Sequence, residues 1–266
     1  MIVRNLLGVL LAVAIALIAR RARSLTTSGA MAAAVAGSVA VAVGWSWGIT
    51  LILYFASSTL LSRLGRVEKE RRTRAVVAKG GERDAWQVLA NGGVFLVAAI
   101  GALLHPQMNW IAIGAGALAA SAADTWATEI GTLYGGPPRS ILTGRVVETG
   151  RSGGITLAGT LASISGAAFI ALVVVVTGAA GQSVAAWHSA RAILLGGIVG
   201  AFADSLIGAT MQSRRWCDDC RCETERDVHH CGARTVPRRG IRWLDNDAVN
   251  FVSTIVGGLL AAFLAR

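Results

Sequence analysis

The sequence predicts an all-α, polytopic transmembrane bundle of about eight spans, and three observations lead to this prediction. Of the 266 residues, 54% are apolar and only 15% are charged. The mean hydropathy is +0.58, and several apolar runs approach or exceed the roughly 18–20 residues that cross a bilayer as helix. The charges are confined to a few blocks between these runs. A soluble α/β protein rich in Ala and Gly would not show that confinement.

The apolar runs divide a single integral-membrane domain, residues 1–266, into spans. The expected spans are 3–19, 29–43, 46–62, 86–104, 109–128, 154–177, 190–211 and 248–264. The first run could be mistaken for a secretory signal. However, Arg20, Arg21 and Arg23 follow it where a signal would have a small-residue cleavage site. We therefore expect a retained first span.

The basic residues predict the orientation of these spans. All Lys and Arg residues except Arg4, Arg191 and Arg266 fall in connections 20–28, 63–85, 129–153 and 212–247. Connections 44–45, 105–108 and 178–189 are expected on the other side. Because short basic loops stay cytoplasmic, we expect a cell-membrane protein with both termini outside and the basic connections inside. The net charge of +10 then reflects topology and anionic headgroups, so nucleic acid is not an expected partner.

A polar stripe ends the fifth expected span, in residues 121–136. On a helix, its hydroxyls and carboxylates fall within one arc of about 140°; they are Ser121, Asp124, Thr125, Thr128, Glu129 and Thr132. A carboxylate at bilayer depth costs roughly 2.5–3.5 kcal/mol or more, so it faces a protein interior, a metal or a substrate. With Asp204, which ends the seventh span, these carboxylates suit Mg²⁺ and phosphate oxygens. The alternative is that they cap helices or pair with loop arginines.

Other polar motifs fall on the same side of the expected membrane. KGGERDAWQVLANGGVF precedes and begins the fourth span and contains Gln87 and Asn91. ADSLIGATMQ places Asp204 and Gln212 on one helical face, and DNDAVN places Asn246 and Asn250 on another. A weak repeat links Ala-Asp-Thr at 123–125 to Ala-Asp-Ser at 203–205. It leaves an internal two-helix repeat open, since Ala/Gly-rich chains match by chance.

Glycines beside these motifs have two interpretations. Gly153 and Gly154 are expected to open the sixth span beside Ser152 and Arg151, where helix N–H groups would suit a phosphate. For Gly92, Gly93, Gly197 and Gly200, close packing of helices is at least as good an explanation. Such small-residue faces also permit a homodimer.

The last basic connection, 212–247, contains the four cysteines. It reads CDDCRCETERDVHHC, with Cys217, Cys220, Cys222 and Cys231 near His229 and His230. The spacing resembles a small zinc knuckle, formed by Cys217, Cys220, His229 or His230, and Cys231. A structural Zn²⁺ and free thiols remain alternatives, whereas a disulfide is disfavoured in a reducing compartment.

Several of these motifs together resemble one known family. They are ADTWATEIG, TGRVVETGRSGGITLAGT, ADSLIGATMQ and GIRWLDNDAVNF, with SLTTSGA and KGGERDAWQVLANGG upstream. They are similar to the integral-membrane domain-of-unknown-function 92 family, which includes plant phytyl-phosphate kinase. The likeness covers nearly the whole chain in the right order.

The resemblance implies an enzyme, a prenyl-phosphate kinase that transfers a phosphoryl group from CTP to an isoprenyl monophosphate, phytyl or polyprenyl, with Mg²⁺. The implied site residues are Asn91, Asp124, Glu129, Ser152, Gly153, Gly154, Asp204, Asn246, Asp247 and Asn250. We expect Asp124 and Asp204 to hold Mg²⁺, with Glu129 as a further ligand or an orienting group. Loop cations would cradle the remaining phosphate charge, and Gln212 adds a polar contact; the cations are Arg83, Arg145 and Arg151.

Two other functions remain open on sequence grounds. A cytidylyltransferase would use much the same residues but release pyrophosphate and leave a CDP-lipid. A lipid or isoprenoid transporter would suit internal repeats and polar residues within spans. However, all polar motifs here fall on one side, whereas alternating access needs polar groups near the midplane.

Overall fold

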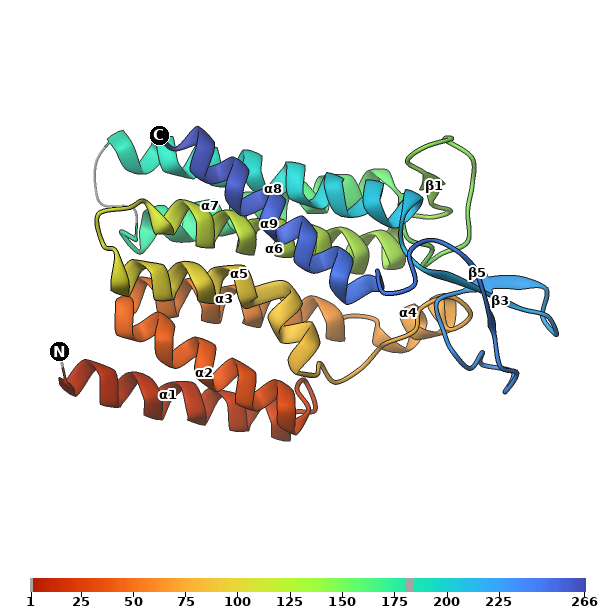
Figure 1. Ribbon diagram of the computed structural model, residues 1–266, viewed down its shortest axis with the longest axis horizontal. Coiled ribbons are helices and arrows are strands. Elements are labelled where there is room, and N and C mark those ends of the chain that lie inside the picture. The colour runs from red at the N-terminus through yellow and green to blue at the C-terminus, as the bar shows by residue number, and fades with distance from the viewer. Residues whose placement is uncertain (1, 180–183) are drawn as a thin grey trace.

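The computed structural model describes residues 2–179 and 184–266. Within them the chain forms nine helices (Figure 1): α1 Ile2–Arg21, α2 Thr27–Val43, α3 Trp45–Arg63, α4 Arg66–Thr73, α5 Ala85–Leu104, α6 Trp110–Tyr134, α7 Leu157–Val176, α8 Val184–Thr210 and α9 Asn246–Leu264. All but α4 are long, and each long helix overlaps one expected span. The predicted all-α membrane bundle is confirmed.

Eight spans are expected, but fewer of the described helices are long and apolar enough to cross a membrane. Five of the described helices pass that test, namely α1, α5, α7, α8 and α9, and α3 with α4 adds a sixth if the bent pair is one span. Helix α2 is apolar but only 17 residues long. Helix α6 carries the polar stripe, which lowers its hydropathy. The count of spans is therefore approximate.

The helices run back and forth, so the bundle has two distinct ends. Both termini lie at one end, and the connections that contain the predicted motifs lie at the other (Figure 1). We call the latter the loop end. The grouping of the motifs agrees with the expected topology, while the compartment that each end faces stays a prediction. Part of the connection expected at 178–189 lies outside the described residues.

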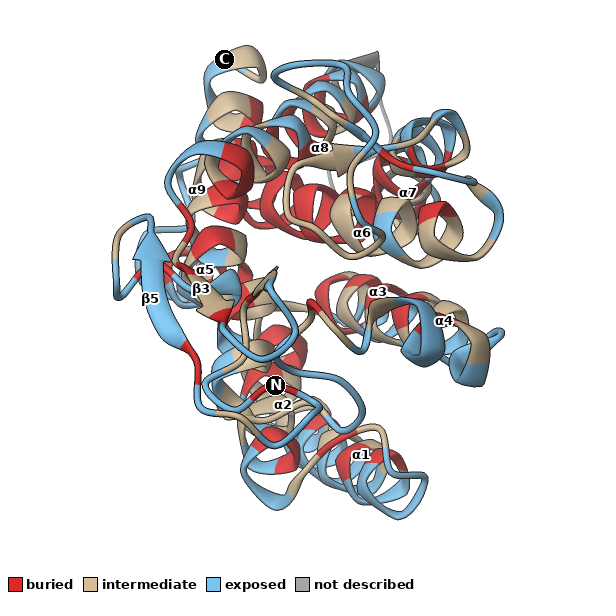
Figure 2. Cartoon of the chain, turned by 90° about the vertical axis from the view of Figure 1, so that its right-hand side faces the viewer, coloured by how far each residue is buried: buried red, intermediate tan, exposed pale blue. Residues whose placement is uncertain are grey.

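Helix α6 is the centre of the bundle. It packs against α3, α5, α7, α8 and α9, and its residues from Gly114 to Ala123 are buried without interruption. Viewed from the loop end, this buried surface lies between the surrounding helices (Figure 2). Because these side chains are almost all Ala or Gly, neighbouring backbones can approach closely, which is how small residues hold membrane helices together.

Glycines on α8 and α9 complete this close packing. A Cβ on Gly196 would lie 2.5 Å from the carbonyl oxygen of Gly257, and one on Gly200 would lie 2.4 Å from the Cβ of Ala120. A Cβ on Gly197 would lie 2.8 Å from Ala119. The packing interpretation therefore accounts for Gly197 and Gly200. By contrast, a Cβ on Gly92 would meet nothing within 4 Å.

Helix starts are fixed by side-chain caps. Asp84 and Gln87 form a capping box at the start of α5, and Asp245 accepts a hydrogen bond from the amide of Ala248 at 3.0 Å at the start of α9. Such caps satisfy backbone N–H groups that have no partner within the helix. They place the motif residues that follow at the loop end.

One expected helix start is wrong. Gly153 has φ +77°, in the left-handed region, and cannot open a helix. Gly154 instead belongs to a short strand, β2 (Gly154–Ile155), which pairs with β1 (Arg139–Ser140). Helix α7 starts after Thr156, whose hydroxyl accepts from the amide of Gly159 at 3.0 Å. Two other boundaries also differ: α6 continues to Tyr134, and α8 begins at Val184.

The connection 212–247 has a structure of its own. It contains a three-stranded antiparallel sheet in the order β4-β3-β5, made of β3 Arg214–Cys217, β4 Cys222–Thr224 and β5 Val236–Arg239. This sheet lies at the loop end of the bundle (Figure 1). We call this segment, residues 212–245, the ribbon.

A sharp bend separates α3 from α4. The two helices meet at 73°, and the buried Lys69 of α4 stabilises the bend by an ion pair with Glu129 of α6. Lys69 also donates to the carbonyl oxygens of Leu61 and Ser62, at 2.8 and 3.1 Å. These contacts hold the last turn of α3, α4 and α6 together.

We expect Gly196→Ala to lower the melting temperature, because the added Cβ would strike the backbone of Gly257. Overpacking of this kind costs about 1–3 kcal/mol. Thermal unfolding of the detergent-solubilised protein, followed by tryptophan fluorescence, measures the change. Gly92→Ala is the matched control, since it makes the same change in a helix where the Cβ meets open space. Equal melting temperatures for the two variants would contradict the role of Gly196 in packing.

Candidate functional site

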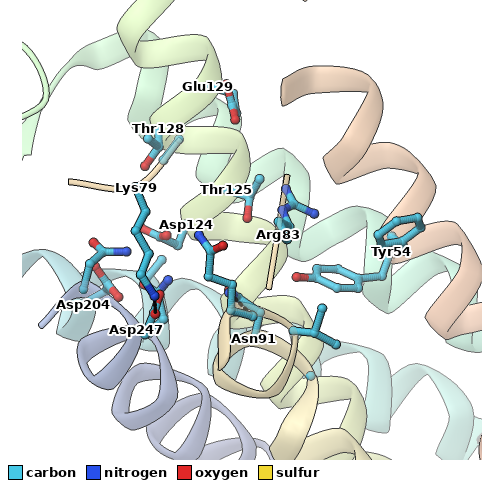
Figure 3. Close-up of a pocket in the computed structure, with 18 of the residues that line it drawn as sticks. Tyr54, Lys79, Arg83, Asn91, Asp124, Thr125, Thr128, Glu129, Asp204 and Asp247 are labelled. Atoms are coloured by element: carbon cyan, nitrogen blue, oxygen red, sulfur yellow. Dashed lines mark hydrogen bonds and ion pairs between the residues drawn. The ribbon is translucent and has the colours of Figure 1, made fainter. Parts of the chain in front are cut away.

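A cavity of about 1120 Å³ joins the predicted motifs. Figure 3 shows Asp124, Asp204, Asp247 and Lys79 around its polar part, at the loop end. The cavity continues between α1, α2 and α3 as an apolar arm, whose lining includes Leu11, Ile15, Val41, Ile49, Ile52 and Phe55. It thus has one charged end and one long apolar extension.

Asp124 of α6 and Asp204 of α8 both line the polar end. The close packing of Gly197 and Gly200 against α6 brings these two helices together. The Oδ2 atom of Asp204 is buried and has no hydrogen-bond partner among the described residues. Because a buried polar atom is nearly always paired, this carboxylate oxygen is available for a cation or a ligand.

Glu129, the other carboxylate of the stripe, has partners within the protein. Its Oε1 accepts from the hydroxyl of Ser62 at 2.7 Å, and its Oε2 pairs with Lys69. It also lines the cavity, about 140° round the helix from Asp124. The structure thus gives Glu129 a role in joining α3, α4 and α6, while the expected role in metal binding stays a prediction.

The Ser152 loop rests on the end of α8. A Cβ on Gly153 would lie 2.4 Å from the Cβ of Ala209, so only glycine fits there. Ser152 donates to Oε1 of Glu225 at 2.5 Å, and Gln212 donates to the same oxygen at 2.9 Å. Ser152, Gly153, Gln212 and Glu225 line the cavity, whereas Ala209 does not. These contacts join the Ser152 loop, α8 and the ribbon around one carboxylate.

Glu225 is a site residue that the sequence analysis missed. Burial raises the pKa of its carboxyl, and the hydrogen bond from Ser152 opposes that rise. It lies in the polar ribbon, where CETERD gives no periodic signal. Its contact with Ser152 spans 73 positions of the chain, so only the fold reveals it.

Lys79 is a second residue that the sequence analysis missed. Its Nζ lies 2.6 Å from Oδ2 of Asp247 and 3.3 Å from Oδ2 of Asp84. Partial burial lowers the pKa of Lys79, but hydrogen bonds to these two carboxylates and their negative charges have the larger combined effect. The pKa of Lys79 is therefore above its usual value. Lys79 therefore keeps its positive charge at neutral pH and places it in the cavity beside the start of α9.

Asn91 belongs to a buried hydrogen-bonded chain between α3, α5 and α6. Tyr54 donates to Ser121 over 2.7 Å, and Ser121 donates to Oδ1 of Asn91 over 2.7 Å. Asn91 in turn donates to the carbonyl oxygen of Gln87 over 2.9 Å. This chain fixes the orientation of the Asn91 amide at the cavity wall. Arg83 lies close by and donates to Ser62 at 3.1 Å.

The structure brings together most of the residues singled out from the sequence. Those that line the cavity are Arg83, Asn91, Asp124, Glu129, Arg151, Ser152, Gly153, Gly154, Asp204, Gln212, Asn246, Asp247 and Asn250. Arg145 is exposed on the connection between α6 and α7 and is not part of this lining. Arg151 is paired with Glu223 at 2.9 Å. The cysteine cluster lies in the ribbon, outside the cavity lining.

The chain has relatives in distant organisms, and it matches two of them over almost their whole length. It is 29% identical to Protein PGR of Arabidopsis thaliana, with 97% of this chain and 95% of that protein covered. It is 30% identical to the uncharacterized membrane protein MJ0933 of Methanocaldococcus jannaschii, over 99% of this chain and 95% of the relative. Protein VTE6, chloroplastic, of Arabidopsis thaliana is 24% identical over 80% of this chain and 56% of its own length.

No solved structure matches the chain. The family model described as integral membrane protein DUF92 matches residues 10–258, which is nearly the whole sequence and includes all or part of each helix that lines the cavity. The resemblance predicted from the motifs is thereby confirmed. The chain belongs to the DUF92 family of integral membrane proteins.

Proposed function

We propose that the protein is a prenyl-phosphate kinase that transfers the γ-phosphoryl group of CTP to an isoprenyl monophosphate, phytyl or polyprenyl. The observation that supports this most is the shape and chemistry of the cavity. A carboxylate-rich end and an apolar arm share one continuous space. An isoprenyl phosphate has the same division, with a charged head and a long apolar tail.

The apolar arm suits the tail. Its walls come from α1, α2 and α3, and it extends as far as Val41 and Trp45 beside the α2–α3 turn. That turn lies at the end of the bundle opposite the loops (Figure 1). A tail that enters this arm would leave lipid rather than water, so close packing of the arm around the tail would provide the attraction. The phosphate head would then lie at the polar end.

The residues of the polar end fit Mg²⁺. Asp124 and Asp204 would hold it, since this ion is usually bound by one or two carboxylates together with substrate phosphate oxygens. The unpaired buried Oδ2 of Asp204 is the atom that supports this assignment. When bound, the ion would neutralise negative charge on the nucleotide phosphates.

Cationic and amide groups of the cavity would bind the remaining phosphate oxygens. Lys79, Arg83 and Arg151 supply positive charge from two different connections, and Asn246 and Asn250 supply amides from the start of α9. Phosphoryl transfer depends on positioning and charge neutralisation more than on covalent chemistry. No general base is needed, because the attacking phosphate oxygen is already anionic.

The proposed reaction is a direct transfer. An oxygen of the prenyl monophosphate attacks the γ-phosphorus of CTP, and the bond from that phosphorus to the β–γ bridging oxygen breaks. The products are the prenyl diphosphate and CDP. The choice of CTP rests on the family resemblance, and the choice of a prenyl acceptor rests on that resemblance and on the apolar arm.

Product analysis tests the reaction. The purified protein is incubated with CTP labelled in the γ-phosphate, Mg²⁺ and prenyl monophosphates of several lengths. We expect label in a lipid diphosphate and formation of CDP. Labelled pyrophosphate with a CDP-lipid would show a cytidylyltransferase instead. No turnover across the panel would contradict an enzyme of this class and favour transport.

We expect Asp204→Asn to lower kcat/KM by about 100-fold or more. The loss of a charged ligand removes several kcal/mol of stabilisation of the developing phosphate charge, and each 1.36 kcal/mol is a factor of ten. Glu70→Gln makes the same carboxylate-to-amide change on the exposed face of α4, outside the cavity lining, and should keep full activity. Full activity of Asp204→Asn would refute its assignment.

We expect Ile52→Trp to discriminate between short and long acceptors. The larger side chain would fill part of the apolar arm, so KM for a long prenyl phosphate rises several-fold while KM for CTP stays unchanged. Leu53→Trp is the matched control, because Leu53 is the next residue of α3, is 37% exposed compared with 39% for Ile52, and does not line the cavity. If both variants behave alike, the tail does not occupy this arm.

A further inference from the structure

The ribbon contains a cluster of metal-ligating side chains that lies outside the cavity lining. Cys217 ends β3, Cys220 lies in the turn before β4, and His229 and Cys231 lie between β4 and β5. One ligand atom from each of the four lies within 4.8 Å of all the others. We propose that these four residues bind a structural Zn²⁺ ion that holds the ribbon in place.

The spacing of the ligand atoms agrees with a tetrahedral zinc site. With Zn–S near 2.3 Å and Zn–N near 2.05 Å, a tetrahedron has S···S edges of about 3.8 Å and S···N edges of about 3.6 Å. The Sγ atoms of Cys217 and Cys231 lie 3.7 Å apart, and Nδ1 of His229 lies 3.3 Å from Sγ of Cys231. A disulfide needs about 2.05 Å, so these sulfurs are not bonded to each other.

His229 is oriented for this role. Its side chain is buried, at 2% exposure, and its Nδ1 points to the cysteine cluster. Its other ring nitrogen, Nε2, lies 3.0 Å from Nδ1 of His230 and 3.6 Å from Sγ of Cys222. A histidine that binds zinc usually has such a partner on its second nitrogen, which fixes the orientation of the ring. His230 and Cys222 thus support the ligand rather than supply one.

The ribbon has little else to stabilise it. In residues 212–245, all of which the structure describes, Cys217 and Leu244 are the only buried apolar side chains. A segment of this size without an apolar core usually needs a disulfide or a metal. A zinc ion bound by all four residues would join both turns of the sheet, and no position would be left open for a catalytic water.

The ribbon also forms part of the cavity wall. Glu225 and Arg215 line the cavity, and the backbone amide of Glu225 donates to the carbonyl oxygen of Val76 at 2.9 Å. Arg214 donates to the carbonyl oxygens of Ser152 and Gly208, at 2.8 and 3.1 Å. Zinc would therefore stabilise the segment that positions Glu225 beside the Ser152 loop. This inference stands whatever reaction the cavity supports.

Metal analysis of the unmodified full-length protein is the direct test. We expect about one zinc per chain in protein purified without chelator. A thiol reagent should react rapidly with Cys222 alone, and the other three cysteines should react only when a chelator removes the zinc. Protein produced in cells supplied with cobalt should show the absorption bands of Co²⁺ in a tetrahedral thiolate site. Metal-free protein in which the exposed Cys220 and Cys231 react as rapidly as Cys222 would overturn the proposal.

Paired variants test the choice of ligands. Cys231→Ser should lose most of the zinc, whereas Cys222→Ser, the same change at a neighbouring cysteine outside the ligand set, should keep about one ion per chain. The zinc content of the two variants is compared only in preparations that elute as a single species from a size-exclusion column. If Cys231→Ser does not give such a species, the thiol and metal measurements on the unmodified protein decide the question. Retention of zinc by Cys231→Ser, or its loss from Cys222→Ser, would refute the assigned ligands.

Discussion

Close contact between α6, α8 and α9 is the interaction on which the site depends. Glycine and alanine let the three backbones approach until a single methyl group would collide, as at Gly196 and Gly257. Membrane helices gain little from burying apolar side chains, because lipid is equally apolar, so packing of small residues must provide the attraction. The same contacts bring Asp124 and Asp204 to one cavity. Stability and the position of the carboxylates thus have a common origin.

The sequence predicted those parts of the site that depend on local patterns. Long apolar runs gave the eight long helices, and polar residues at helical spacing gave Asp124, Asp204 and Asn250, which line one cavity. Lys79 and Glu225 have no such pattern, because their partners lie far away along the chain. The wrong start of α7 has a similar reason. The left-handed turn at Gly153 results from contact with α8, which no local rule describes.

The loop end combines two ways of building structure. In the bundle, small residues and helix caps determine the fold with few charges. In the ribbon, few apolar side chains are buried, and hydrogen bonds to Val76, Val77 and Ser152 attach the segment to the rest. The cavity lies where these two parts meet. Helices form much of the cavity lining, and the ribbon, which has little apolar core, forms part of the cavity wall.

The bend between α3 and α4 has a consequence for where the protein sits in the lipid. Helix α4 turns by 73° from α3 and carries Arg66, Arg71 and Arg72 at the loop end of the bundle. Such a basic helix is attracted to anionic headgroups. Because Lys69 joins α4 to Glu129 in the cavity wall, the position of this basic helix is coupled to the polar end of the cavity.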